Sequence, residues 1–240
     1  DSQYKFSVNK KGNIRFGLGA IKGVGDSAVQ AIVKEREANG PYKGIFDFVE
    51  RVNLSACGKK TIESLAISGA FDSFKEIHRE DFTALNSKGE IFLETLVRYG
   101  VKVQNDKMSQ ATSLFGSVAP IVTTPPEIPR GVPLSDIERL DKERELVGMY
   151  LSAHPLDAYK LELLYGCNTR MTDLKDRESL LNKELTFGGV VVDYRTGIGK
   201  RGGQYGFLKI EDYSGAEDIP LFGQDFIDYG TVSYTHLTLP

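Results

Sequence analysis

The sequence predicts an α+β protein in which an N-terminal all-α domain is joined by a linker to a partial antiparallel β-barrel. Three observations indicate this class. Five of the nine prolines fall between Pro120 and Pro133, in a stretch without helical or alternating apolar period. Before this stretch, apolar residues recur at helical spacing. Well after it, from Leu185 onward, they alternate as in strands.

The N-terminal part is predicted to be a set of short helices joined by glycine-containing turns. Its apolar positions recur as in amphipathic helices, and they are Ala28, Ile32 and Val33, then Ile45, Phe46 and Val49, then Ile62, Leu65 and Ala66. A longer helical stretch is predicted from about Phe82 to Tyr99, with a buried face formed by Phe82, Leu85, Ile91, Phe92 and Leu96.

After the linker, the period changes from helix to strand. The stretch from Leu134 to Leu164 predicts two helices separated at His154-Pro155, because proline disfavours a helical conformation in the preceding residue. Alternation then predicts strands at residues 185–192, 205–210 and 216–222, connected by the turns TGIGKRGGQ and DYSG. Consecutive strands of this kind suit a small antiparallel barrel.

The charge of the chain is unevenly distributed, although the formal net charge is only −3. Residues 1–80 contain 13 Lys and Arg against 10 Asp and Glu, whereas residues 81–240 contain 17 against 23. The first third is therefore the better place for a phosphate backbone.

Cysteine usage and hydropathy favour a cytoplasmic protein. Cys57 and Cys167 are far apart and no Cys-x-x-Cys occurs, so we expect free thiols and no structural metal, with a disulfide as the alternative. No apolar run approaches the ~20 residues of a membrane span, and the N-terminus lacks a secretory pattern. We therefore expect no membrane partner.

A first candidate site is the Gly23-Val24-Gly25 turn, which separates a short helix from one that begins near Asp26 or Ser27. Glycines at a helix start expose backbone N–H groups, and the helix dipole favours an anion there, such as a DNA phosphate. The alternative is a turn that only satisfies helix geometry. The candidate DNA contacts are Lys22, Gly23, Val24, Gly25 and Ser27.

A second candidate unit, CGKKTIESLAISGAFDSF, has the same character. Lys59 and Lys60 stand at the start of its helix, and Gly69 stands at its end, where a left-handed cap is easily adopted. Either lysine could contact phosphate. The alternative is that the unit is ordinary core, since most of its other residues are apolar.

These segments resemble a known family. IRFGLGAIKGVG followed by SLAISGAFDSF is similar to the bacterial DNA polymerase III alpha subunit just after its fingers, and LDKERELVGMYLSAHPLDAY is similar to the helix before its OB domain. The resemblance implies a C-terminal portion with a tandem helix-hairpin-helix domain at 1–100, a linker at 101–134, linker helices at 135–165 and a partial OB fold at 166–230. Residues 231–240 do not resemble the family's continuation, which suggests foreign or frame-shifted sequence.

The segment QATSLFG, residues 110–116, is a candidate partner-binding peptide. Apolar Leu114 and Phe115 in an unstructured stretch suit a partner's pocket, the alternative being that they pack on their own domain. The resemblance implies the family's sliding-clamp peptide, with Gln110 in a polar subsite and the two apolar side chains in another. The candidate clamp contacts are Gln110, Ser113, Leu114 and Phe115.

The predicted barrel segment offers aromatic residues beside basic ones. Tyr194, Tyr205 and Phe207 lie near the Lys200-Arg201 turn, and aromatics on a strand face can stack single-stranded bases, worth roughly 1–3 kcal/mol each. Alternatively, the face that Tyr205 and Phe207 share is the core of the barrel.

No catalytic residue is predicted. Glu211 and Asp212 adjoin a strand end but precede Tyr-Ser-Gly, which is typical of a turn. The resemblance places the Mg²⁺-binding carboxylates of a DNA-directed DNA polymerase in a palm that this chain lacks, and no cofactor is expected here.

The resulting hypothesis is a portion of a replicative polymerase that binds DNA and attaches to the sliding clamp. It would hold primer-template duplex without sequence preference, and its further partners would be single-stranded template and other replicase subunits. A free-standing helix-hairpin-helix/OB adaptor in DNA repair or recombination is one alternative, and a scaffold that contacts only protein is another.

Overall fold

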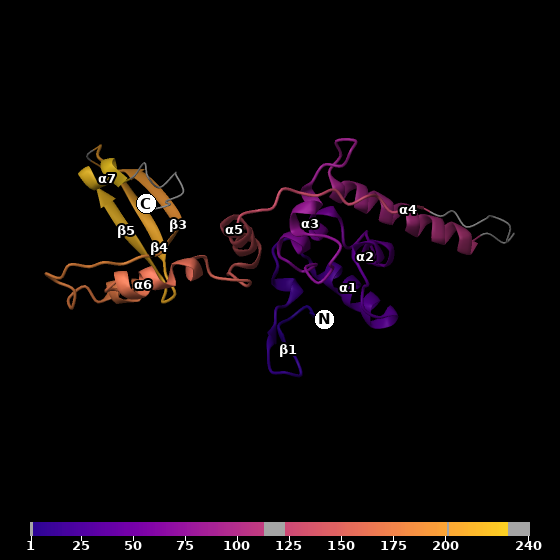
Figure 1. Cartoon of the computed structure of the whole chain (residues 1–240), viewed down its shortest axis with the longest axis horizontal. Coiled ribbons are helices and arrows are strands. Elements are labelled where there is room, and N and C mark those ends of the chain that lie inside the picture. The colour runs from indigo at the N-terminus through magenta and orange to yellow at the C-terminus, as the bar shows by residue number, and fades with distance from the viewer. Residues whose placement is uncertain (1, 113–122, 201, 230–240) are drawn as a thin grey trace. The chain divides into compact units, whose positions relative to one another are not determined.

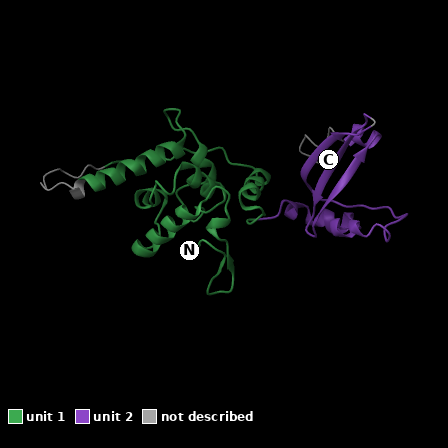
Figure 2. Ribbon diagram, turned by 180° about the vertical axis from the view of Figure 1, so that it is seen from behind, with its two compact units in different colours: residues 1–152 green, residues 153–240 purple. Residues whose placement is uncertain are grey.

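The chain forms two compact units, residues 1–152 and 153–240 (Figures 1 and 2). The computed structural model describes residues 2–112, 123–200 and 202–229, the side chains of 110–112 excepted. The first unit is helical and carries one small β-hairpin, and the second contains a three-stranded antiparallel sheet. The predicted α+β class is therefore confirmed.

Unit 1 is built around one hydrophobic core that α1 to α4 share. Val29, Ile45, Ile62 and Leu96, one from each of these helices, are fully buried in it. The elements, with η for a 3-10 helix, are β1 (Ser7–Val8), β2 (Ile14–Arg15), η1 (Leu18–Ala20), α1 (Asp26–Asn39), α2 (Ile45–Arg51), α3 (Lys59–Ile67), η2 (Arg79–Thr83), α4 (Phe92–Thr112) and α5 (Asp136–Val147).

The long helix of unit 1 begins later than predicted. We expected helix from Phe82 onward, but α4 starts at Phe92. The intervening residues form a tight turn, because the Asn86 side chain accepts hydrogen bonds from two backbone N–H groups that follow it, and Gly89 has a φ of +76°. Apolar spacing could not reveal this turn, which depends on a side chain bonding to its own backbone.

The turn changes which apolar residues are buried. Phe82, Phe92 and Leu96 are buried as predicted, but Leu85 is 62% exposed. The prediction for Leu85 was wrong because it assumed a continuous helix, in which residue 85 would share the face of residues 82 and 92.

Helix α4 also extends into the segment that we predicted as linker. Gln104 holds it there, since its side-chain amide donates to the carbonyl groups of Val49 and Val52, both at 2.8 Å. From residue 123 to 135 the chain has neither helix nor strand, as the prolines predicted. Because α5 then packs against α3, the two compact units divide after Ser152 and not within the linker.

Unit 2 contains the sheet, whose strands run in the order β3-β4-β5 and are antiparallel throughout. Within the described residues these strands do not close into a barrel. The elements are η3 (Pro155–Tyr159), α6 (Lys160–Gly166), η4 (Met171–Lys175), β3 (Val190–Ile198), β4 (Gln204–Glu211), β5 (Ala216–Phe222) and α7 (Gln224–Tyr229).

Two of the three strands lie where the sequence predicted them, and β3 does not. It begins at Val190 instead of residue 185, because Thr186 is hydrogen-bonded through its N–H and carbonyl to Asn168. It also continues to Ile198, since Thr196 to Ile198 pair with β4 and leave only residues 199–203 for the turn.

Candidate nucleic-acid interface

The start of α1 has the geometry that the Gly23-Val24-Gly25 sequence predicted. The Val24 N–H donates to the Ile21 carbonyl at 3.0 Å, and the Val24 side chain is buried. Gly25 precedes the helix in an extended conformation without a side-chain cap, and α1 begins at Asp26. The N–H groups of a first helical turn have no partner within the helix. Gly23, Gly25 and Ser27 are exposed, so this end of the helix faces solvent.

The two glycines serve different purposes. Gly23 has a φ of +87°, and a Cβ placed on it would lie 2.7 Å from the Ser64 Oγ of α3. Gly25 has an ordinary φ of −77°, and a Cβ there would meet nothing within 4 Å. Gly23 is therefore required by the fold, whereas the absence of a side chain at Gly25 leaves open space over the helix entrance.

The charges at this entrance partly oppose each other. Lys22 is exposed, and its backbone N–H donates to the Leu146 carbonyl at 2.8 Å. Asp26 occupies the first turn of α1, where its carboxylate accepts a hydrogen bond from the Gln30 amide at 2.7 Å. A carboxylate at a helix N-terminus competes with phosphate for the same dipole. An anion would therefore approach from the Lys22 and Gly25 side.

The second predicted unit lies between α2 and α3 and has a similar entrance. Gly58 precedes α3 in an extended conformation, and a Cβ there would also meet nothing within 4 Å. Lys59 forms an ion pair with Glu94 of α4 at 2.5 Å, whereas Lys60 is exposed and has no ion-pair partner in the described part of the chain. Lys60 is therefore the lysine available for phosphate.

The end of α3 confirms the predicted left-handed cap. Gly69 has a φ of +80°, its N–H donates to the Ala66 carbonyl at 3.1 Å, and the Ala70 N–H donates to the Leu65 carbonyl at 2.9 Å. This pair of bonds is the Schellman pattern, which satisfies carbonyl groups at a helix end.

The fold brings the two entrances together. Thr61, in the first turn of α3, donates from its hydroxyl to the Gly23 carbonyl at 3.4 Å, and Ser64 of the same helix lies against Gly23. We call residues 22–27 and 58–61 the paired helix entrances. Together they bring two helix N-termini and the side chains of Lys22 and Lys60 to one region of unit 1.

The β1-β2 hairpin is a basic element that our reading of the sequence missed. Between Asp1 and Asp26 the chain has five Lys and Arg residues and no Asp or Glu. Lys10 and Lys11 stand at the tip of the hairpin, where the Asn9 side chain accepts from the Lys11 N–H at 2.9 Å. Counting charge over thirds of the chain obscured this acid-free stretch.

In unit 2, the aromatic residues divide between the two faces of the sheet. Tyr205 is directly opposite Phe222, and their rings form a cluster with Phe207 at centroid distances of 5.8–6.3 Å. Tyr205 and Phe207 are half-buried, and Phe222 is 57% exposed. The shared face that we predicted for Tyr205 and Phe207 is therefore partly open to solvent. Phe222 also belongs to this aromatic cluster, which the alternation of residues on β4 alone could not show.

The opposite face is the covered one. A Cβ on Gly206 would lie 3.0 Å from the Tyr194 ring and 3.2 Å from the Phe226 ring of α7. Leu221, directly opposite Gly206, is buried. Tyr194 therefore does not join Tyr205 and Phe207, although all three lie close together in the sequence.

The basic turn beside the aromatic face is described only in part. Lys200 is exposed in the turn between Gly199 and Gly203, which their backbone hydrogen bond closes at 2.8 Å. Arg201 lies outside the described residues. Arg195, on the aromatic face, is paired with Asp193 and Asp218.

The predicted clamp-binding peptide falls almost entirely outside the described residues. Gln110 belongs to the last turn of α4, and Ser113, Leu114 and Phe115 are not described. After this segment, Thr123 contacts α4 through its hydroxyl, which donates to the Asp106 carboxylate at 3.0 Å.

Asp212 forms a turn, as predicted. It accepts hydrogen bonds from Ser214 and Gly215 through one oxygen and from the Met171 N–H through the other. Burial alone would raise its pKa, but these hydrogen bonds outweigh burial and lower it. No group of three or more His, Cys, Asp or Glu side chains suited to a metal ion occurs in the described residues.

Two further sequence features can be compared with the structure. Cys57, which is buried, and Cys167, which is half-buried, are both free thiols, as expected. Across residues 2–112, 123–200 and 202–229, every helix is too short or too polar to cross a membrane. Residues 231–240, which we singled out as atypical, are not among those described.

Comparison with known proteins shows what unit 1 is similar to. Residues 1–82 match the family model described as the helix-hairpin-helix motif. This match includes both helix entrances and the hairpin that precedes them.

Longer matches extend through both units. The chain is 35% identical to a DNA polymerase III subunit alpha of Haemophilus influenzae, over 95% of this chain and 19% of that protein. It is 34% identical to the same subunit of Pasteurella multocida (95% and 19%) and 33% identical to that of Escherichia coli K12 (91% and 18%). The resemblance to bacterial DNA polymerase III alpha subunits is thus confirmed along nearly the whole chain, which spans about a fifth of the length of these relatives.

Proposed function

We propose that unit 1 holds primer-template duplex through the paired helix entrances, without sequence preference. The observation that carries this proposal is the contact of Thr61 and Ser64 with Gly23, which sets the entrance of α3 beside that of α1. Two helix N-termini on one surface can meet successive phosphates of a DNA strand. Backbone N–H groups, Lys22 and Lys60 would contact only the phosphates, so base sequence would matter little.

The open space at Gly25 and Gly58 provides the test. Gly25→Ala and Gly58→Ala add a methyl group over each entrance, and nothing within 4 Å obstructs it. We expect each variant to bind a short primer-template duplex roughly fivefold to thirtyfold more weakly, because the methyl group obstructs a charge-assisted hydrogen bond worth about 1–2 kcal/mol. Fluorescence anisotropy with duplexes of two sequences would measure affinity and base preference together.

The matched control is Gly166→Ala at the end of α6, where a Cβ also meets nothing within 4 Å. It should leave duplex affinity unchanged. If folded Gly25→Ala and Gly58→Ala proteins bind duplex as tightly as the control, the entrances do not hold phosphate. Gly23→Ala is not a useful test, since its positive φ and the contact with Ser64 would disturb the fold itself.

We propose that unit 2 adds a contact to single-stranded template through Tyr205, Phe207 and Phe222. The partial exposure of the aromatic face supports this, since stacking needs rings that bases can reach. Lys200, at the adjacent turn, would contact the strand's backbone.

Attachment to a sliding clamp through residues 110–116 is a further part of the proposal. Its support is the course of α4, where Val103 is the last buried residue among the described side chains and Met108 is 70% exposed. Figure 1 shows α4 running out beyond the other helices of unit 1. In this proposal the peptide that follows α4 would bind the clamp, and attachment to a closed ring would keep the polymerase at high effective concentration on DNA.

Replacing Leu114 and Phe115 with Ala should abolish pull-down by the clamp and leave duplex affinity unaltered. Clamp binding that survives in the double variant would eliminate the peptide from the proposal.

For the longer protein we propose DNA-directed DNA polymerase activity in the bacterial cytoplasm, with other replicase subunits as partners. The support is the alignment with relatives that are named DNA polymerase III subunit alpha. The Mg²⁺-binding carboxylates would lie outside this chain, which would therefore bind DNA without transferring nucleotides.

A further inference from the structure

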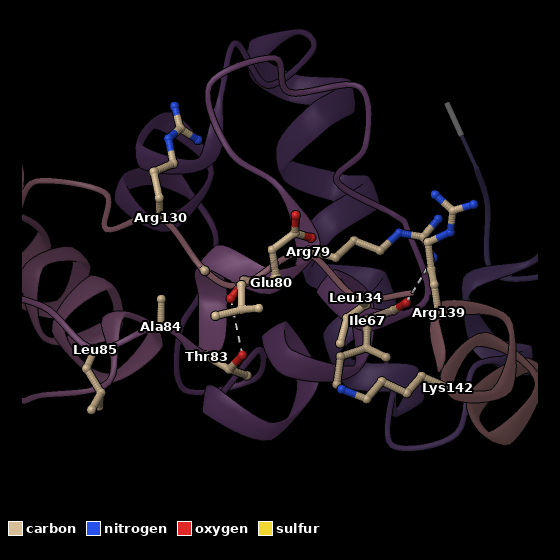
Figure 3. A pocket seen from close by; sticks show the side chains of 12 residues that line it. Ile67, Arg79, Glu80, Thr83, Ala84, Leu85, Arg130, Leu134, Arg139 and Lys142 are labelled. Atoms are coloured by element: carbon tan, nitrogen blue, oxygen red, sulfur yellow. Dashed lines mark hydrogen bonds between the residues drawn. The ribbon is translucent and has the colours of Figure 1, made fainter. Parts of the chain in front are cut away.

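A cavity of about 440 Å³ opens in unit 1 between η2, the segment 130–134 and α5 (Figure 3). Arg79, Arg130, Arg139 and Lys142 contribute cationic groups to its lining. The same cavity has aliphatic walls, among them Leu85, which the sequence had predicted to be buried. Of the cationic groups, Arg79 also forms an ion pair with the buried Glu143 of α5 at 3.8 Å and so helps to hold η2 and α5 together.

The walls of this cavity are firmly built. Asp81, whose side chain is 1% exposed, accepts a hydrogen bond from the Gly131 N–H at 2.8 Å and forms an ion pair with Arg130 at 3.0 Å. A Cβ on Gly131 would lie 2.4 Å from the Glu80 carbonyl oxygen, so the segment 130–134 lies directly on η2. Backbone packing therefore forms this wall of the cavity before any ligand binds.

One donor in the lining lacks an acceptor. The Nε of Arg139 is buried and has no hydrogen-bond partner in the described part of the chain, although the Nη2 of the same side chain pairs with Asp136 at 3.0 Å. Because this Nε is itself buried, a ligand in the cavity can reach only the other atoms of the Arg139 side chain, which is 42% exposed. Lys142, one helical turn further along α5, is exposed and has no ion-pair partner among the described residues.

Two of the four cations in the lining are already paired. Arg79 pairs with Asp72 at 2.5 Å, and Arg130 pairs with Asp81. Figure 3 shows Arg139 and Lys142 on the side of the cavity where Ile67 and Leu134 lie. An anionic group would therefore be received by Arg139 and Lys142, next to aliphatic side chains.

We propose that this cavity binds an acidic peptide segment with an aliphatic anchor, contributed by a protein partner. Leu85 and Val132 are 62% and 85% exposed, and an aliphatic side chain of the peptide would cover them while its carboxylates meet Arg139 and Lys142. A DNA phosphate fits less well, because it would leave the aliphatic walls in water. This site is separate from the paired helix entrances and does not depend on their role.

Methyl-resolved NMR of the whole chain tests this proposal with the synthetic peptide Asp-Glu-Asp-Leu-Leu-Asp-Glu-Asp. We expect saturable shifts of the Ile67, Leu85, Val132 and Leu134 methyl groups. Lys142→Glu and Val132→Asp should each weaken peptide binding at least tenfold, an effect of the size seen at interface anchors. Lys142→Arg should retain binding.

The matched charge control is Lys102→Glu, an exposed position on α4 outside the cavity. It should bind the peptide as the unaltered chain does, and methyl spectra of the variants without peptide would show that each is folded. Absence of saturable shifts, or an equal loss in Lys102→Glu, would overturn the proposal. So would a short DNA duplex that displaces the peptide and shifts the same methyl groups, which would make the cavity a phosphate site.

Discussion

Units 1 and 2 present their candidate DNA contacts in opposite ways. In unit 1 the proposed contacts are backbone N–H groups at two helix entrances, supported from beneath by a core that four helices share. In unit 2 they are the aromatic side chains of Tyr205, Phe207 and Phe222, which stand on the open face of a sheet. Among the hydrophobic residues described for unit 2, only Leu156, Met171 and Leu221 are buried.

The difference follows from how each secondary structure uses its backbone. A helix leaves the N–H groups of its first turn without partners, so its end can bind an anion directly. The inner strand of a sheet, such as β4, has its backbone groups paired on both sides, and only its side chains remain for binding. Under the proposed function, the same kind of ligand would therefore be bound by charge in unit 1 and by ring surface in unit 2.

The prediction with the largest effect is that the two units have separate stabilities. Phe48 is 2% exposed, and its ring packs edge-on against Tyr42 and Phe71 at centroid distances of 4.9 and 5.0 Å. Phe48→Ala should lower the free energy of unfolding of unit 1 by about 3–5 kcal/mol through the cavity it leaves. Denaturant unfolding, monitored by hydrogen exchange in each unit, would measure this free energy.

Unit 2 supplies the control, since its exchange rates should not change in Phe48→Ala. Leu221→Ala should have the reverse pattern and a smaller effect, because Leu221 lies in a thinner core. If either variant destabilises both units equally, they unfold as one body and the comparison fails.

The next effect is on salt dependence. With Lys22 and Lys60 each on a phosphate, raising the salt concentration from ~50 to ~200 mM should weaken duplex binding roughly 12-fold, whereas a single-stranded oligonucleotide held by stacking and one lysine should lose only about threefold. Anisotropy titrations over several salt concentrations would give both slopes.

Neighbouring lysines sharpen the salt test. Lys60→Gln should reduce the duplex slope by about one unit, as the loss of one phosphate contact does. Lys59→Gln should change it less, because Lys59 is paired with Glu94. Equal slopes for duplex and single strand would mean that both units bind by charge.

A smaller effect concerns the aromatic face. Phe222→Ala should weaken single-strand binding roughly tenfold, within the range for loss of one stacked base, and should leave duplex binding unchanged. Tyr165→Ala is the control, because Tyr165 is 81% exposed on α6 of the same unit and is not part of the cluster. The stacking role is refuted when the two variants have the same single-strand affinity.

The smallest effect uses the cysteines as reporters of each unit. Burial raises the pKa of the Cys57 thiol to about 12, so at pH 8 iodoacetamide should modify Cys57 in unit 1 far more slowly than Cys167 in unit 2. Mass spectrometry of timed samples would show the order of modification. Rapid labelling of Cys57 in the folded protein would contradict the tight core proposed for unit 1.

The same raised pKa implies a pH dependence. Above its ordinary pKa of 9.0, Cys57 ionises in the unfolded chain but not in the folded one, so unit 1 should lose stability as the pH rises from 9 toward 12. Tyr42, whose pKa is raised to about 12 by burial and by Glu35, acts in the same direction above pH 10. Denaturant midpoints measured between pH 8 and 11 would show the decline.

What the sequence determined by itself was local. The start of α1 after Gly25, the left-handed cap at Gly69 and the irregular chain from residue 123 follow from glycine and proline conformations, which need no distant partner. Strand β5 was predicted at its observed bounds, because alternation and a flanking turn sufficed. The resemblance to polymerase III alpha subunits likewise rested on contiguous segments.

Tertiary structure decided how these local pieces combine. Only the fold placed Thr61 against Gly23, left Leu85 at a cavity mouth, and put Phe222 with Tyr205 while sending Tyr194 to the other face. Each of these outcomes depends on strand register or helix packing between residues far apart in the chain. Apolar periodicity reports which side of an element is buried but carries no information on which distant element covers it.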